Sequence, residues 1–130
     1  MHRVGGWYSR LQSARPGNEI NHIPAKKAYK HLDLSPSSGP SIRMEYADHR
    51  AVTSTGSGRP AKQWHQAQKD LIDQGKFDEA MKMDIDDIRA RFGTKYDQHI
   101  ADMVASMPDN KSLQRLLNDN GWTINYDLLK

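Results

Sequence analysis

A histidine at the end of a short predicted strand is the residue of this sequence best suited to acid–base chemistry. Residues 19–24 read Glu-Ile-Asn-His-Ile-Pro, and the alternation of a strand places Glu19 and Asn21 on one face with Ile20 pointing inward. The proline cannot donate to a sheet ladder, so it ends the strand and leaves His22 at its rim. Because an imidazole titrates near pH ~6.5, His22 is our candidate general base for taking a proton from water.

Two more histidines lie in polar parts of the sequence downstream. His49 stands between Asp48 and Arg50. The carboxylate can orient the imidazole, and the planar guanidinium of Arg50 can clamp a phosphate in the transition state. Ligands close to the base would hold a divalent metal ion against a phosphate, so Glu19, His49 and His65 are our candidate ligands. The alternative is that each is an ordinary surface or hydrogen-bonded residue, as we expect for His2, His31 and His99.

The charge of the chain is unevenly distributed. Residues 1–69 carry 11 Lys and Arg against 4 Asp and Glu, whereas residues 70–130 carry 8 against 12. The basic half contains the candidate histidines, and a positive field around a site favours a polyanionic substrate. We therefore expect Lys26, Lys27 and Arg43 to contact nucleic acid. The alternative is ordinary variation in surface charge.

The size and composition of the chain limit the classes of protein and of functional site that remain. A chain of 130 residues fits one domain with one modest core. It has no cysteine, which excludes disulfides, thiolate zinc sites and cysteine nucleophiles. No stretch approaches the ~20 apolar residues of a membrane span. The first residues lack the apolar core of a signal peptide, and we expect the chain to be part of a longer protein.

Two strands and a first helix are predicted around the candidate residues. The first strand covers residues 19–23. Residues 41–46 alternate polar and apolar side chains, which predicts a second strand whose inward residues are Ile42, Met44 and Tyr46. Polar segments at 35–40 and 53–58 predict loops. A helix over 60–73 follows, and its predicted buried stripe is Trp64, Ala67, Leu71 and Ile72.

The spacing of apolar residues predicts three further helices. The first ends at Gly93, the second at Pro108 and the third at Asn120-Gly121. We interpret Asp84, Asp86 and Asp87 as a solvated acidic face rather than a metal site. Residues 122–129 are a final strand or an extended tail. The predicted class is α+β in one domain, 1–130, with a catalytic front at 1–75 and a helical cap at 76–130.

The motifs at 19–24 resemble the first strand of the HNH nuclease family. The whole set is similar to a toxin branch of the HNH/endonuclease VII superfamily, which is described by a Glu-His-His-His signature. Glu19 and His22 match its first motif, the Asp-His-Arg turn contains His49, and His65 matches the last histidine. Residues 6–11 match its Gly-x-Tyr-x-x-Leu segment with a shift of one, and residues 39–44 match a Gly-Pro-x-Ile-x-Met strand. The resemblance covers roughly residues 5–75.

This resemblance implies a ββα-metal (His-Me finger) core, one divalent ion such as Mg²⁺, Mn²⁺ or Zn²⁺, and hydrolysis of phosphodiester bonds. It also implies the toxic C-terminal domain of a larger bacterial protein that is secreted or delivered. Such a domain acts in the cytoplasm of the target cell, and an immunity protein neutralises it in the producer. Asn21 stands where the family usually has Asp or His, and the gap from His22 to His49 implies an insertion at 25–40.

We therefore expect a metal-dependent DNase in which His22 is the base and Arg50 the clamp. One alternative keeps the chemistry and changes the substrate to RNA. A second alternative is a non-enzymatic module that binds nucleic acid or protein through its basic front and helical back.

Overall fold

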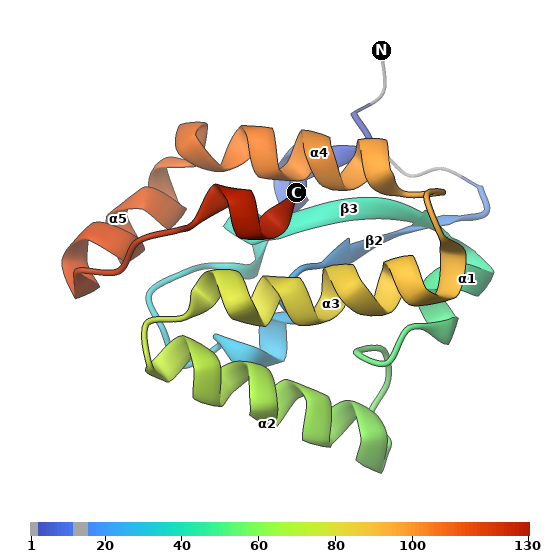
Figure 1. Ribbon diagram of the computed structural model, residues 1–130, viewed down its shortest axis with the longest axis horizontal. Coiled ribbons are helices and arrows are strands. Elements are labelled where there is room, and N and C mark those ends of the chain that lie inside the picture. The colour runs from blue at the N-terminus through green and yellow to red at the C-terminus, as the bar shows by residue number, and fades with distance from the viewer. Residues whose placement is uncertain (1–2, 12–15) are drawn as a thin grey trace.

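The computed structural model describes residues 3–11 and 16–130, which form an α+β fold (Figure 1). The strands are β1 (Gly5–Trp7), β2 (Asn18–His22) and β3 (Pro40–Glu45). The α-helices are α1 (Tyr46–Ala51), α2 (Arg59–Asp73), α3 (Phe77–Phe92), α4 (Asp97–Ser106) and α5 (Lys111–Asn120). Short 3₁₀ turns are η1 (Tyr8–Leu11), η2 (Lys26–Ala28), η3 (Pro36–Ser38), η4 (Met107–Asp109) and η5 (Tyr126–Leu129).

The three strands form an antiparallel sheet in the order β1-β3-β2, so β3 is central and β2 lies at an edge. Directly paired residues share a face of such a sheet. Asn21 pairs with Ile42, which is fully buried in the core, and Asn21 itself is 4% exposed. Ile20 alternates with Asn21 and is only half-buried. The prediction that Ile20 points inward is therefore wrong. In the observed register it is Asn21, and not Ile20, that lies on the same face of the sheet as the buried Ile42.

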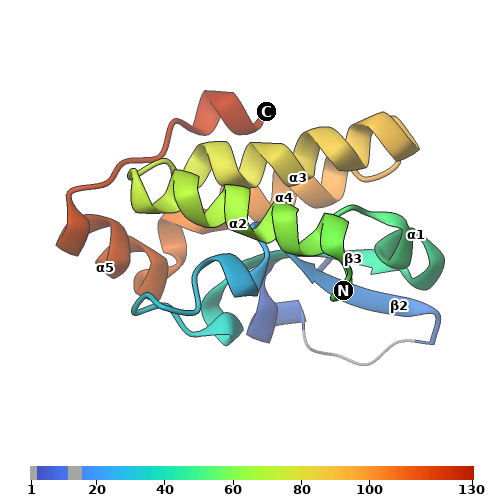
Figure 2. The same ribbon diagram turned by 90° about the horizontal axis from the view of Figure 1, so that it is seen from below.

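Helices cover the sheet and share one core with it. Helix α4 packs against β1 and β3, and α2 and α3 lie side by side (Figures 1 and 2). At Gly5 the approach of α4 is so close that a Cβ would lie 2.0 Å from the backbone oxygen of His99. The buried core joins Ile42 of β3 with Ile100 and Leu117 of the later helices. No helix in the described part of the chain is long and apolar enough to cross a membrane.

Most predicted elements are confirmed with small changes in their bounds. The strands at 19–23 and 41–46 correspond to β2 and β3, and the helix at 60–73 corresponds to α2. Tyr46 is not inward: it begins α1 and is 50% exposed. Strand β1 was not predicted, and residues 122–129 form no strand but end in η5.

The buried face of α2 differs from the predicted stripe. It consists of Ala61, His65, Gln68 and Ile72. Trp64 and Leu71 are half-buried and Ala67 is exposed. Burial of Gln68 is tolerated because its amide is bonded on both sides: Oε1 accepts from the backbone N–H of Ala25 at 3.3 Å, and Nε2 donates to the carbonyl of Ala80 at 3.0 Å.

Two aspartates of α3 form hydrogen bonds to other parts of the fold. The interpretation of Asp84, Asp86 and Asp87 as a solvated acidic face is therefore wrong for Asp84 and Asp87. Asp84 is buried and accepts hydrogen bonds from the indole of Trp64 at 2.7 Å and from Gln68 at 2.8 Å. Burial raises the pKa of Asp84 to about 7. Asp87 accepts from the backbone N–H of Thr53 at 2.8 Å and so fastens the 52–58 loop. Of the three, Asp86 alone is exposed.

Replacement of Asp84 by alanine is expected to lower the free energy of unfolding by about 2 kcal/mol, because it leaves two buried N–H donors without an acceptor. Urea denaturation measures this. Since burial raises the folded-state pKa of Asp84, its stabilising effect is complete below 3.8, the ordinary pKa of an aspartate, and is lost as pH rises through about 7. The variant should lack that pH dependence. The control Asp86→Ala should change stability by less than ~0.5 kcal/mol; equal losses in both variants would contradict the prediction.

Candidate functional site

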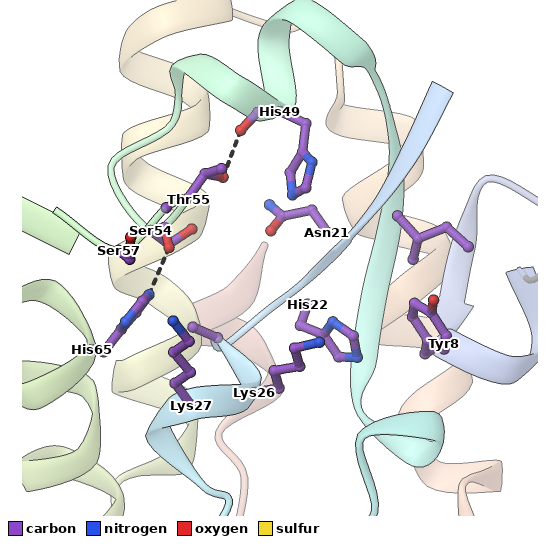
Figure 3. A pocket seen from close by; sticks show the side chains of 13 residues that line it. Tyr8, Asn21, His22, Lys26, Lys27, His49, Ser54, Thr55, Ser57 and His65 are labelled. Atoms are coloured by element: carbon purple, nitrogen blue, oxygen red, sulfur yellow. Dashed lines mark hydrogen bonds between the residues drawn. The ribbon is translucent and has the colours of Figure 1, made fainter. Parts of the chain in front are cut away.

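A pocket of about 420 Å³ lies along the open edge of β2 (Figure 3). It brings together five of the predicted site residues, which come from four different elements: His22, Lys26, Lys27, His49 and His65. The other lining residues are Tyr8, Ile20, Asn21, Ala25, Ser54, Thr55, Gly56 and Ser57. The sequence therefore identified the residues that meet here, although they span more than 40 positions of the chain.

His22, the last residue of β2, is held in one tautomer. Its Nε2 lies 2.9 Å from the carbonyl oxygen of Pro36. A carbonyl only accepts, so Nε2 carries the proton and a neutral ring keeps the lone pair on Nδ1. Tyr8 stacks on the ring with centroids 4.7 Å apart and an angle of 13°. Burial lowers the pKa of His22 below 6.5, and the positive charge of Lys26 lowers it further, against an opposing contribution from the Pro36 hydrogen bond. The ring is neutral at pH 7.

His49 is paired with Glu19. Helix α1 follows β3 without a break and contacts β2, which places Nδ1 of His49 2.8 Å from Oε1 of Glu19. The hydrogen bonds from His49 and then from Arg50 lower the pKa of Glu19, so the carboxylate is ionised and Nδ1 donates. Nε2 of His49 has no hydrogen-bond partner within residues 3–11 and 16–130. Glu19 thus lies behind His49 and does not line the pocket.

Asp48 and Arg50 do not take the expected positions. The carboxylate of Asp48 binds Lys95 at 2.7 Å and the hydroxyl of Tyr96 at 2.6 Å, so it does not orient His49. The guanidinium of Arg50 lies within 3.5 Å of Glu19 and over the ring of Tyr46, outside the pocket lining. In this arrangement Arg50 supports Glu19 and does not reach into the pocket.

His65 projects from α2 toward the 52–58 loop. Its Nε2 donates to the carbonyl of Ser54 at 2.6 Å, which leaves Nδ1 with the lone pair of a neutral ring. The same loop is joined to α1, because the hydroxyl of Thr55 donates to the carbonyl of His49 at 2.6 Å. Figure 3 shows both bonds on one side of the pocket, with His22 and Tyr8 across β2 from them.

Two of the three predicted nucleic-acid contacts are on the surface. Lys26 and Lys27 are exposed, line the pocket, and form no ion pair with a carboxylate in the described part of the chain. Arg43 is only 5% exposed, and its guanidinium donates to the carbonyl of Leu11. The expectation that Arg43 contacts nucleic acid is therefore wrong. Its place in the central strand, covered on both faces, puts it inside the protein.

Several residues of the site were not chosen from the sequence. Tyr8 belongs to the segment that precedes the first motif, but its stacking on His22 depends on η1 folding beside β2. Pro36 acts through a backbone oxygen, which no side-chain pattern can indicate. Asn21 is buried under the pocket, and Figure 3 shows its side chain pointing toward His49. The hydroxyl-rich loop at 53–58 was predicted as a loop only.

The pocket offers few side-chain ligands for an ion. No three His, Asp or Glu side chains are clustered as a metal site among the described residues. His49 nevertheless has the carboxylate–histidine arrangement in which a carboxylate, here Glu19, fixes the tautomer of a metal ligand. An imidazole ligand suits Zn²⁺, whereas Mg²⁺ commonly binds through one or two carboxylates and substrate phosphates and keeps several waters. No family model, curated protein or solved structure matches this chain.

Proposed function

We propose that this chain is a metal-dependent endonuclease that hydrolyses phosphodiester bonds in DNA. One observation carries the proposal. Three histidines from β2, α1 and α2 line one pocket, and in each ring one nitrogen is bonded to a protein acceptor while the other has no partner among the described residues. Imidazoles held in this way are prepared to accept a proton or to bind a cation.

His22 is the general base of the proposed reaction. It is neutral at pH 7, its Nε2 is held by Pro36, and Tyr8 limits rotation of the ring. Nδ1 takes the proton from the water that attacks phosphorus, and the bond from phosphorus to one sugar oxygen breaks as the new P–O bond forms. The leaving sugar oxygen takes a proton from solvent. The proton taken from the attacking water stays on His22 until solvent removes it. Lys26 lies close enough to affect the pKa of His22 and would contact the same phosphate through its ammonium group.

His49 is the proposed metal ligand, Glu19 orients it, and His65 is a further candidate ligand. A divalent ion bound there would stabilise the charge that develops on the phosphate. Glu19 moves from ligand to positioning residue in this proposal, because its oxygens are already occupied by His49 and Arg50. The antiparallel β2–β3 pair followed by α2 is compatible with the ββα-metal core that the resemblance implies.

A plasmid-nicking assay with Mg²⁺ or Mn²⁺ tests the proposal, with chelated protein and the His22→Ala variant as controls. Parallel assays on duplex DNA, single-stranded DNA and RNA separate a DNase from an RNase. Cleavage that depends on the ion and on His22 is the expected result. A protein that binds nucleic acid but never cuts it would instead be a binding module.

The role as an interbacterial toxin, with an immunity protein as partner, is supported by the sequence resemblance alone. Expression in the bacterial cytoplasm should stop growth and damage DNA, and His22→Ala should remove the effect. Growth arrest that the alanine variant still causes would contradict this role.

Neutralisation of phosphates by the pocket lysines should make binding depend steeply on salt, because each contact releases counterions. With His22→Ala as the background, so that nothing is cut, the Lys26→Glu/Lys27→Glu double variant should flatten the slope of log affinity against log salt by about 2. Titration of a short duplex across a salt series measures this.

The matched control is Lys76→Glu/Lys111→Glu, which changes the net charge equally at exposed positions outside the pocket lining. It should leave most of the slope intact. A larger effect from the control pair would mean that the pocket does not face nucleic acid.

A further inference from the structure

The segment that holds His22 is itself held by the C-terminal half of the chain. The acceptor of the His22 proton is the carbonyl of Pro36, the first residue of η3. Two residues later, the carbonyl of Ser38 accepts a hydrogen bond of 2.7 Å from Nδ2 of Asn110. Pro36 and Ser38 belong to one three-residue turn, which is closed by a 3.1 Å hydrogen bond from the backbone N–H of Gly39 to the carbonyl of Pro36. We therefore expect a shift at one end of the turn to move the other.

Asn110 uses both ends of one buried amide. The residue is 4% exposed. Its Oδ1 accepts from the backbone N–H of Leu113 at 3.1 Å, which caps the first turn of α5, while its Nδ2 reaches η3. The cap alone does not require asparagine, because aspartate and serine cap helices about as well. The donated bond to η3 does require the amide, since a carboxylate only accepts.

We infer that Asn110 is a positioning residue for the general base: it anchors η3 to α5 and thereby holds the Pro36 carbonyl against Nε2 of His22. The effect on cleavage rests on the proposed nuclease function, whereas the effect on the His22 ring does not. Asn110 does not line the pocket, so its loss should change the rate of the chemical step and leave substrate binding almost unchanged.

The expected loss is partial, because η3 has other supports. The side chain of Ser35 caps the turn by accepting from the backbone N–H of Ser37, and η3 packs against η1. We expect Asn110→Asp to lower kcat about tenfold with KM changed less than about twofold, since small misplacement of a catalytic group costs between ten- and a hundredfold.

Asn110→Asp is the informative variant because it keeps the oxygen that caps α5 and replaces the donor to the Ser38 carbonyl with an acceptor. Asn125→Asp is the control for the cap: Asn125, which is exposed, also caps a turn, η5, by accepting from the backbone N–H of Asp127 at 3.2 Å. Thermal melting of both variants monitors the fold. Nitrogen-15 NMR of the histidine rings follows the Nε2–H proton of His22, which the bond to Pro36 should protect from solvent exchange.

The expected result is an exchange-protected His22 ring proton in wild type and in Asn125→Asp, with loss of protection and of kcat in Asn110→Asp. Equal protection in all three proteins, or equal loss in the control, would overturn the inference. If Asn110→Asp fails to fold, Asn110→Ser replaces it and is judged by the same loss of ring-proton protection and of kcat, since the shorter serine still caps the helix. If wild type cuts no nucleic acid, the proposed function fails, while the ring-proton measurement still decides whether Asn110 positions His22.

Discussion

Replacement of His22 by alanine is expected to reduce the rate of DNA cleavage by at least ~100-fold, because the proposed reaction loses its general base. The fold should survive. His22 lies at the end of an edge strand and is only half-buried, so the free energy of unfolding should change by about 1 kcal/mol. Single-turnover cleavage of a labelled duplex measures the rate, and urea denaturation measures the stability.

The matched control is His31→Ala. His31 is bonded to Asp73 at 2.8 Å and does not line the pocket, so cleavage should be unaffected. Cleavage at the wild-type rate by His22→Ala would show that His22 is not the base.

The pH profile offers a second check on His22. The ring accepts a proton only when neutral, and burial lowers its pKa below 6.5. The rate should therefore fall as pH drops through a midpoint below 6.5. A fall in rate whose midpoint lies above pH 6.5 would contradict the assignment of His22 as the base.

Replacement of His49 by alanine is expected to lower the affinity for Mn²⁺ by more than ~100-fold, because the proposed ion loses its main side-chain ligand. Glu19→Gln should lower the affinity about tenfold to a hundredfold, because the amide preserves the shape but removes the negative charge that orients His49 and increases its basicity. Isothermal titration calorimetry in a metal-free buffer measures both affinities.

His65→Ala distinguishes a two-histidine site from a one-histidine site. A loss comparable to that of His49→Ala would make His65 a ligand, and an unchanged affinity would restrict it to holding the Ser54 carbonyl. Unchanged affinity in both His49→Ala and His65→Ala would remove the metal site from this pocket. The same His31→Ala protein serves as the control for nonspecific binding to histidine.

Most of the elements, and five of the residues that line the pocket, follow from the sequence. A strand ended by proline, alternating residues before α1 and apolar spacing at helical periods are local signals, and they predicted β2, β3 and α2 to α5 to within a few residues. The choice of His22, His49 and His65 followed from residue type and from the Glu-His-His-His resemblance. These choices required no knowledge of long-range packing.

Tertiary structure alone decided what each selected side chain touches. Glu19 and His49 are 30 positions apart, and their pairing depends on α1 folding back beside β2. Arg43 looked like a surface cation, yet both faces of its strand are covered.

The helices illustrate the same physical reason. Hydrophobic periodicity on α2 favoured Trp64 and Leu71, but the buried face carries His65 and Gln68. The Ser54 carbonyl of the 52–58 loop is the partner of His65, and α3 supplies Asp84 and the Ala80 carbonyl as partners of Gln68. A polar side chain is buried only where its hydrogen bonds are satisfied, and those partners come from distant parts of the chain. Local pattern therefore determined which residues could do chemistry, and long-range hydrogen bonding decided which of them are positioned to do it.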